Sequence, residues 1–247
     1  MSSTILKAYH DKEFLDCREA RPLRILSEYL GPEKKFKENG VKHTVVFFGS
    51  ARIKPDSSDP MSKYYHAADD LSYRLASWSE SRPSPEEKIF ICTGGGPGIM
   101  EAANKGASRA GGQTIGLNIS LPFEQNPNPY ISKDLNFEFH YFYMRKMWFL
   151  YQAKAIVVFP GGYGTFDELF ETLTLIQTKK IKKHYMLVYL YDREYWEKLI
   201  NFKMLADLNL ISREDLDIFK FFDTPEEGFN MMIPDIIKST DDVEKML

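Results

Sequence analysis

The stretch AIVVFPGGYGTFDE, from Ala155 to Glu168, decides the fold of this chain. An apolar, β-branched run ends at Pro160, three glycines follow within four residues, and two carboxylates close the stretch. Beyond it, apolar residues recur at helical spacing, at Phe166, Leu169, Phe170, Leu173 and Ile176. The pattern predicts a buried strand, a glycine loop and a helix.

A glycine loop in this position suits phosphate binding. Backbone N–H groups can approach a phosphate where no side chain intervenes, and the positive end of the following helix favours the negative charge. An acid in the first turn of that helix lies beside the ligand. The combination therefore predicts chemistry on a nucleotide rather than packing alone.

Composition bounds the class of protein. The chain has 247 residues, 43% hydrophobic and 27% charged, which predicts a folded globular protein of one large or two small domains. A formal net charge of −3 gives no support for nucleic-acid binding. No apolar run reaches about 18 residues, so no transmembrane helix is expected. The first residues also lack the apolar core of a signal peptide.

Cysteine and histidine usage argues against a zinc site. The chain has two cysteines, Cys17 and Cys92, and its five histidines are scattered. Cys92 lies in an expected buried strand, which favours a reduced core thiol over a disulfide. We therefore expect a cytoplasmic protein that holds no metal.

Strand and helix patterns alternate from about residue 44 onward. The expected strands cover 45–48, 89–92, 114–119, 137–142, 155–159, 186–191 and 218–222. The expected helices cover 11–37 (with breaks at Pro22 and Gly31-Pro32), 64–78, 99–110, 144–153, the segment after the glycine loop, 194–208, a short segment after Ser212, and the segment from Pro225. This alternation predicts an α/β fold, a Rossmann-like doubly wound, mostly parallel sheet with helices on both faces. No linker is visible, so we expect one nucleotide-binding domain over 1–247, with 1–40 as an N-terminal helical extension.

Three loops leave the carboxyl ends of expected strands, at Gly49–Arg52, Thr93–Gly98 and Gly161–Thr165. Ligands of open α/β sheets bind outside those strand ends. One glycine loop alone is equally well a tight turn, but three on one sheet edge favour a nucleotide or phosphate site. Neither glycine loop continues as a P-loop, and neither has the spacing of a standard NAD fingerprint.

Glu168 lies about 200° around its helix from Phe166, so it points away from the core stripe. It is either a site residue or a solvated carboxylate that the helix dipole favours. Asp167, Glu171 and Thr174 share another stripe of the same helix. A solvated or capping role is the more common one for the two acids, and Thr174 is equally a ligand contact or a surface residue.

Arg145 and Lys146 open the helix that precedes this strand. Two surface cations are the simpler interpretation, but a phosphoribosyl ligand needs a bidentate cation, which Arg145 would supply. Glu101 either complements the dipole of its own helix or faces the ligand. The aromatic residues of this region favour a core or a subunit interface over a base-stacking platform: Tyr141, Phe142, Tyr143, Trp148, Phe149 and Tyr151.

These motifs together resemble those of the LOG family, cytokinin-activating phosphoribohydrolases that are widely labelled lysine decarboxylases. Pro160 to Glu168 fits the signature PGGxGTxxE, and Arg145-Lys146 resembles the family's RK pair, 23 positions before Glu168. The runs TGGGPGIMEAA from Thr93 and FGSAR from Phe48 are similar to two further family segments. The resemblance covers about residues 44–192.

The resemblance implies hydrolysis of the N-glycosidic bond of a nucleoside 5′-monophosphate, with no cofactor and no metal, by a homodimer or larger homo-oligomer. It implies Arg145 and Glu168 as the catalytic pair. A carboxylate suits this reaction because N-glycoside cleavage passes through an oxocarbenium-like state. The substrate-binding residues predicted from the resemblance and the loops are Gly49, Ser50, Gly94, Gly95, Gly96, Glu124, Lys146, Gly161, Gly162, Gly164, Thr165 and Thr174.

The chain departs from the compact plant-type members in its N-terminal helical segment and its longer C-terminal part. The segment 121–130 resembles that of a longer bacterial branch, and we expect an ordered loop or a lid there. Glu124 would take the place of a substrate-contacting acid. These departures leave the substrate open, and it is AMP, N6-prenyl-AMP or both.

Two other functions compete with the hydrolase. A non-catalytic nucleotide-binding or sensing protein of the same fold could dispense with Glu168, so the intact Arg145 and Glu168 pair argues against it. An amino-acid decarboxylase needs a lysine that holds pyridoxal phosphate as a Schiff base. No lysine of the sequence is convincingly placed for that role.

Overall fold

A parallel sheet forms the centre of the computed structural model, which describes residues 6–121, 126–181 and 186–244. All of its neighbouring strands pair in parallel. Within the described ranges the sheet has seven strands in the order β4-β3-β2-β1-β5-β6-β7. Their bounds are β1 His43–Phe48, β2 Ile89–Thr93, β3 Thr114–Ile119, β4 Asn136–Phe139, β5 Ala153–Val158, β6 Leu187–Tyr191 and β7 Phe219–Phe222.

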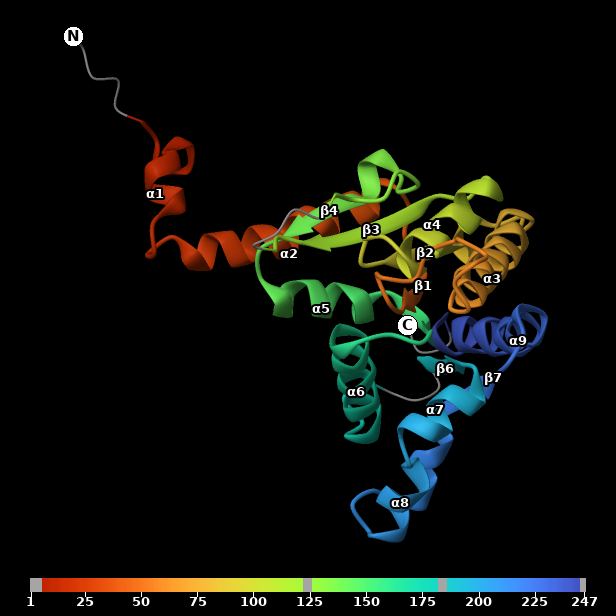
Figure 1. The fold of residues 1–247 in the computed structure, drawn as a ribbon. Helices are drawn as coiled ribbons and strands as arrows, with labels where there is room; N and C mark the ends of the chain where they lie inside the picture. The colour runs from red at the N-terminus through yellow and green to blue at the C-terminus, as the bar shows by residue number, and fades with distance from the viewer. Residues whose placement is uncertain (1–5, 122–125, 182–185, 245–247) are drawn as a thin grey trace.

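Helices cover both faces of this sheet. Their bounds are α1 Lys12–Asp16, α2 Arg21–Glu38, α3 Ser62–Glu80, α4 Ile99–Arg109, α5 Phe142–Tyr151, α6 Tyr163–Gln177, α7 Arg193–Leu199, α8 Phe202–Asp207 and α9 Pro225–Glu244. The short 3-10 turns are η1 Ala8–His10, η2 Pro85–Glu87, η3 Lys133–Leu135 and η5 Arg213–Asp217. Figure 1 shows α3, α4 and α9 grouped together, α5 and α6 apart from them, and α1 projecting at the N-terminal end.

Alternate residues of the strands supply two cores, one on each face, because successive side chains of a strand point in opposite directions. Val45 and Phe47 of β1 pack with α3, α4 and α9. Val46 and Phe48 of the same strand pack with α2, α5, α6 and α7. The strands are therefore buried on both sides, and the predicted doubly wound α/β fold is confirmed.

The predicted helix break at Gly31-Pro32 is wrong, since α2 runs through it. Proline lacks the N–H that would donate to the carbonyl four residues earlier, which is that of Glu28. The indole Nε1 of Trp148 donates to that carbonyl instead, at 3.0 Å. A side chain from α5 thus replaces the missing backbone hydrogen bond. The other break is confirmed, because Pro22 stands in the first turn of α2, after α1 has ended.

The single helix predicted over 194–208 is also wrong, because α7 and α8 are separate there. Ile200 adopts an extended conformation, and the side chain of Asn201 accepts a hydrogen bond from the N–H of Met204 at 3.0 Å. Asparagine is a favoured N-cap, so it starts a new helix. Similarly, the extended segment predicted over 137–142 ends at Phe139, and α5 begins at Phe142.

Within the described ranges, no helix combines the length and apolar character that crossing a membrane requires. The same ranges contain no group of three or more histidine, cysteine, aspartate or glutamate side chains that could hold a metal ion. Cys17 and Cys92 are both free thiols, and Cys92 is buried in β2.

Candidate functional site

The three predicted loops meet where the order of the sheet reverses. β1 lies between β2 and β5, so the carboxyl ends of these strands flank the topological switch point, where open α/β sheets bind ligands. The N–H of Ser50 donates to the carbonyl of Pro160 at 3.1 Å, and the N–H of Ile99 donates to the carbonyl of Ser50 at 3.0 Å. These hydrogen bonds confirm that the loops share one edge.

Close backbone contact between the loops requires glycine at two positions. A Cβ on Gly161 would lie 2.1 Å from Oγ1 of Thr165 and 3.0 Å from the backbone nitrogen of Ser50. Gly98 has a φ of +73°, and a Cβ there would lie 2.3 Å from the carbonyl oxygen of Ser50. A side chain at either position would push the loops apart.

The loops enclose a cleft of about 580 Å³. We call one group of lining residues the polar end: Ser50, Ala51, Arg52, Gly162, Tyr163, Gly164 and Thr165. We call another group the apolar end: Gly94, Met100, Ile119, Leu121, Phe142 and Phe149. The rest of the described lining is Phe48, Gly49, Phe166 and the charged pair Arg145 and Glu168.

Helix α6 begins at the polar end without a side-chain cap. Gly162 is its N-cap residue, and no side chain caps the N–H groups of the first turn. Uncapped N–H groups and the helix dipole together attract an anion. Tyr163 is 96% exposed, so the cleft opens to solvent at this end.

Glu168 lies one turn further along α6 and is only 6% exposed. The solvated alternative for this carboxylate is therefore wrong. Burial raises the pKa of Glu168 to about 7, while the nearby cations Lys146 and Arg145 lower it. Glu171 and Asp167 add smaller upward contributions. The carboxyl group consequently changes charge near neutral pH, which suits a group that exchanges protons during a reaction.

Arg145, in the first turn of α5, faces Glu168 with Nη2 3.9 Å from Oε1. Its guanidinium lies 5.1 and 5.5 Å from the ring centres of Phe142 and Phe149. Burial lowers the pKa of Arg145, and its Nε has no hydrogen-bond partner among the described residues. Arg145 itself lines the cleft, so its guanidinium can donate to an oxygen atom of a ligand there.

Lys146 does not line the cleft. Its Nζ lies 2.8 Å from Oδ2 of Asp167 and 2.7 Å from Oε2 of Glu171. These two acids therefore bind a lysine of α5 rather than a ligand, and the three side chains tie α5 to α6 beside the catalytic candidates.

Several other predicted residues also lie apart from the described lining. Thr174 is exposed, and its hydroxyl donates to the carbonyl of Phe170 at 2.7 Å. Gly95 and Gly96 are not among the described lining residues, and the amide of Asn128 donates to both of their carbonyls at 3.1 Å. Glu101 accepts a hydrogen bond from Tyr65 at 2.9 Å. Glu124 lies outside the described residues, as do its neighbours 122, 123 and 125 in the predicted loop or lid over 121–130.

The cleft is also lined by residues for which the sequence predicted no binding role of their own. Arg52 lines the polar end, and Met100 lines the apolar end. Phe142 and Phe149, expected to be core or interface residues, line the apolar end on either side of Arg145. Their spacing of three before and four after Arg145 on one helix is the signal that could have revealed them.

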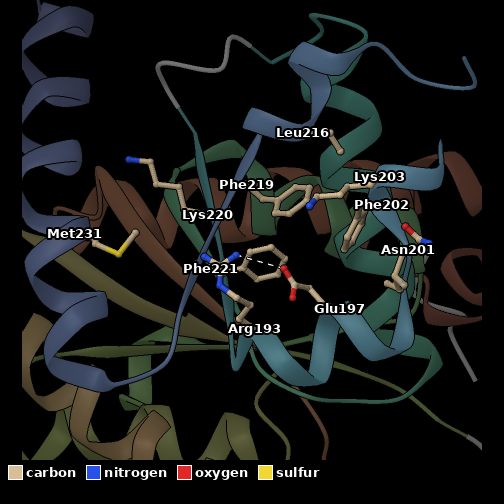
Figure 2. A pocket seen from close by; sticks show the side chains of 11 residues that line it. Arg193, Glu197, Asn201, Phe202, Lys203, Leu216, Phe219, Lys220, Phe221 and Met231 are labelled. Carbon is tan, nitrogen blue, oxygen red and sulfur yellow. Dashed lines mark hydrogen bonds and ion pairs between the residues drawn. The ribbon is translucent and has the colours of Figure 1, made fainter. Parts of the chain in front are cut away.

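A second cavity of about 660 Å³ lies between α7, α8 and β7. Figure 2 shows its aromatic side chains Phe202, Phe219 and Phe221, with Arg193 and Glu197 paired beside Phe221. It contains none of the predicted site residues, so the cleft at the switch point is the candidate functional site.

The sequence model of the family described as "Possible lysine decarboxylase" matches residues 100–232, which is more than half of the chain. The chain belongs to this family, the LOG family. The match covers Arg145 and the whole glycine loop with Glu168.

Curated relatives of this LOG-family chain include two enzymes. It is 33% identical over 102 residues to a pyrimidine/purine nucleotide 5′-monophosphate nucleosidase of Escherichia coli K12, covering 36% of this chain and 21% of the relative. It is 29% identical over 135 residues to the cytokinin riboside 5′-monophosphate phosphoribohydrolase LOG2 of Arabidopsis thaliana, covering 53% and 55%. The chain thus spans about a fifth and about half of these relatives.

Solved structures show the same fold. The molybdenum cofactor binding protein of Rippkaea orientalis matches with a TM-score of 0.55 and 19% identity, over 79% of this chain and 98% of that chain. The Moco carrier protein of Chlamydomonas reinhardtii matches with a TM-score of 0.53 and 19% identity, over 80% and 99%. At this identity the likeness concerns the fold of the LOG-family chain alone.

Proposed function

We propose that this chain is a nucleoside 5′-monophosphate N-glycosidase, which hydrolyses AMP, N6-prenyl-AMP or both to the free base and ribose 5-phosphate. One observation carries the proposal. A buried carboxyl group, Glu168, faces Arg145 in a cleft that ends at an uncapped helix N-terminus. The names of the curated relatives support the reaction class.

The two ends of the cleft fit the two ends of a nucleotide. The 5′-phosphate would bind at the polar end, on the N–H groups of Gly162, Gly164 and Thr165, with Arg52 as a cation. The base would lie at the apolar end, against Met100 and Phe142. The ribose and the glycosidic bond then lie between the ends, beside Glu168.

Glu168 would act on the developing positive charge of the ribose. As the bond from C1′ to the base nitrogen breaks, the base leaves with the bonding electron pair and gains a proton from solvent, and the proton that Glu168 takes up in the reaction later returns to solvent. The ionised carboxylate stabilises the oxocarbenium-like ring and takes a proton from the water whose oxygen bonds to C1′. This role requires the charged form, so kcat/KM rises as the pH passes the pKa of Glu168, which is about 7.

Arg145 would hold the substrate and orient the carboxylate. Its guanidinium lies 3.9 Å from Glu168 and lines the cleft, where it can donate to a ribose or phosphate oxygen. Arginine suits this task because its planar group donates several hydrogen bonds in fixed directions. Contacts of this kind hold the substrate in a fixed orientation to the carboxylate, so the reaction proceeds as if within one molecule.

A protein that binds a nucleotide without chemistry is the second candidate, and the position of Glu168 argues against it. A carboxylate in an anion-binding cleft repels a phosphate, and its burial costs stability when it is charged. Binding alone gives no reason to keep such a group. A reaction that needs a proton acceptor beside the ribose gives such a reason.

The family description "Possible lysine decarboxylase" does not fit the residues of the cleft. That chemistry needs a lysine to bind pyridoxal phosphate. Among the described residues that line the cleft, none is a lysine. Lys146, the lysine of the family motif, points to Asp167 and Glu171 instead.

Base release tests the proposal directly. Wild type, Glu168→Ala and the control Glu194→Ala are incubated with AMP, N6-prenyl-AMP and the other nucleoside monophosphates, and the bases are separated by chromatography. Glu194 lies on α7 and pairs with Lys198 outside the cleft. We expect activity in wild type and the control, and a loss of at least about a hundredfold in Glu168→Ala.

Nucleotide binding by wild type without release of any base would overturn the hydrolase and leave the binding protein. The substrate panel also decides the base preference. The homo-oligomer and the cytoplasmic location expected above belong to this proposal, and size-exclusion chromatography tests the former.

A further inference from the structure

The N-terminal helix α2 holds the beginning of α5 through one carboxylate. Oε1 of Glu28 accepts a hydrogen bond from the N–H of His140 at 2.8 Å. Oε2 accepts another from the N–H of Tyr141, the N-cap residue of α5, at 3.2 Å. The two oxygens of one side chain therefore bind two consecutive N–H groups immediately before α5.

A second contact ties the same residue to the next turns of α5. The indole Nε1 of Trp148 donates to the backbone carbonyl of Glu28 at 3.0 Å, the carbonyl that Pro32 leaves without its helical donor. The rings of Tyr29 and Phe36 lie 5.5 and 5.2 Å from the ring of Trp148. α2 thus fixes α5 at its start and again beyond Arg145.

Helix α5 in turn carries Arg145 and both aromatic rings that flank it. The guanidinium has few bonds of its own to hold it, since Nε lacks a partner among the described residues and Glu168 is 3.9 Å away. The position of Arg145 over the cleft therefore follows the position of α5.

We propose that Glu28 is a positioning residue of the active site, which sets the placement of Arg145 against Glu168 by holding the start of α5. This inference rests on the proposed function, because it takes Arg145 and Glu168 as the reacting pair. It makes the N-terminal segment part of the catalytic framework rather than an appendage.

A carboxylate is the side chain that suits this position. Glutamate supplies two acceptor oxygens for two N–H donors, and its negative charge stabilises the positive end of α5. Glutamine keeps one acceptor and loses the charge, and alanine keeps neither. The effect of substitution should therefore increase from Glu28→Gln to Glu28→Ala.

The test compares these two variants with Glu33→Gln, a matched control on the same helix. Glu33 binds Lys37 at 3.1 Å, and no contact with α5 is described for it. We expect kcat/KM for AMP to fall about tenfold in Glu28→Ala, less in Glu28→Gln and not at all in Glu33→Gln, because small misplacements of a catalytic group slow a reaction strongly.

The pH profile separates positioning from loss of folding. The charged groups facing Glu168 are Arg145 and Lys146 on α5, and Asp167 and Glu171 on α6. Withdrawing Arg145 removes a charge that lowers the pKa of Glu168. The acid limb of the profile should then move to higher pH in Glu28→Ala, whereas unfolding only reduces the amount of active protein.

The affinity for AMP is measured by calorimetry on the same four proteins. This measurement distinguishes failure of the proposed function from failure of the present inference. If wild type releases no base, the proposed function fails, and weaker AMP binding by Glu28→Ala than by Glu33→Gln still supports positioning of Arg145. Equal affinity in that case overturns the inference. In an active enzyme, an unshifted pH profile in folded Glu28→Ala overturns it.

Discussion

Arg52 supplies a cation at the polar end of the cleft, while Arg145 lies between aromatic rings near the apolar end. The N–H of Arg52 donates to Oγ of Ser50 at 3.1 Å, which fixes the backbone from which its side chain starts. The N–H of Ser50 donates to Pro160 before the glycine loop, and Arg52 lines the cleft beside that loop, where the proposed function puts the phosphate. Arg52 is thus the residue on which recognition of the 5′-phosphate should depend most.

The variant Arg52→Ala should raise the KM of nucleoside monophosphates about tenfold, since a hydrogen bond to a charged group contributes about 1.5–3 kcal/mol and solvent weakens it here. Arg52→Lys keeps the charge but loses the planar donor group, so its KM should rise less. Steady-state kinetics with AMP measures both. An unchanged KM in Arg52→Ala would place the phosphate elsewhere in the cleft.

Single residues of the site were predictable where a short stretch of sequence around them carries the signal. Glu168 and Arg145 stand out because a carboxylate follows a glycine loop and an arginine opens the preceding helix. Burial of Glu168 was not predictable, since it depends on Arg145 and Lys146 of α5, which lie against the acidic side chains of α6. Thr174 shows the converse, because helical spacing alone cannot tell a cleft-facing residue from an exposed one.

At the scale of elements, the junction between β5 and α6 depends on one glycine. A methyl group on Gly161 would meet Oγ1 of Thr165 and the backbone of Ser50, whereas none of the surroundings lies within 4 Å of a Cβ on Gly162. Gly161→Ala should therefore destabilise the protein by about 1–3 kcal/mol and weaken AMP binding, as overpacking does. Gly162→Ala should reduce the stability less and weaken AMP binding less.

Denaturant unfolding and AMP titration of the two glycine variants measure these effects side by side. Equal losses in both variants would contradict a role for the contact between Gly161 and Ser50. The comparison works because the two residues are neighbours in one loop and differ in what surrounds their Cα atoms.

Local sequence signals predicted most elements, and the failures have tertiary causes. The run 114–119 gave a strand with the same bounds as β3. α2 contradicts the usual effect of proline because Trp148, far away in the sequence, satisfies the carbonyl that Pro32 leaves free. The division between α7 and α8 was visible in principle, since Asn201 is a favoured N-cap residue.

At the scale of the whole molecule, the site exists because of the strand order. Val46 of β1 pairs with Cys92 of β2 on one side and with Ile156 of β5 on the other. Patterns along the chain predict strands but not their neighbours, and the crossing from β4 to β5 through α5 is what creates the switch point. The edge that holds the loops was predictable from fold rules, but the cleft was not.

One sheet serves both cores, so we propose that the described ranges act as a single domain. Domains with shared cores unfold cooperatively. A charge buried in the cleft then affects the stability of the whole protein, and Glu168 is such a charge.

Stability should therefore depend on pH through Glu168. Its pKa is about 7 in the folded protein and 4.5 when unperturbed, so the folded state binds the proton more tightly. The stability that this proton contributes is fully present below pH 4.5 and is lost as the pH rises through about 7. Glu168→Gln carries no such proton, so it lacks this dependence.

The free energy of unfolding of wild type minus that of Glu168→Gln should fall between pH 5 and pH 8 by an amount on the order of 1–3 kcal/mol. Chemical denaturation at both pH values measures this difference, and taking it between two proteins cancels the titration of all other groups. A constant difference would show that Glu168 has an ordinary pKa. In that case the acid limb of the activity profile would have to arise from the substrate phosphate, which ionises near pH 6.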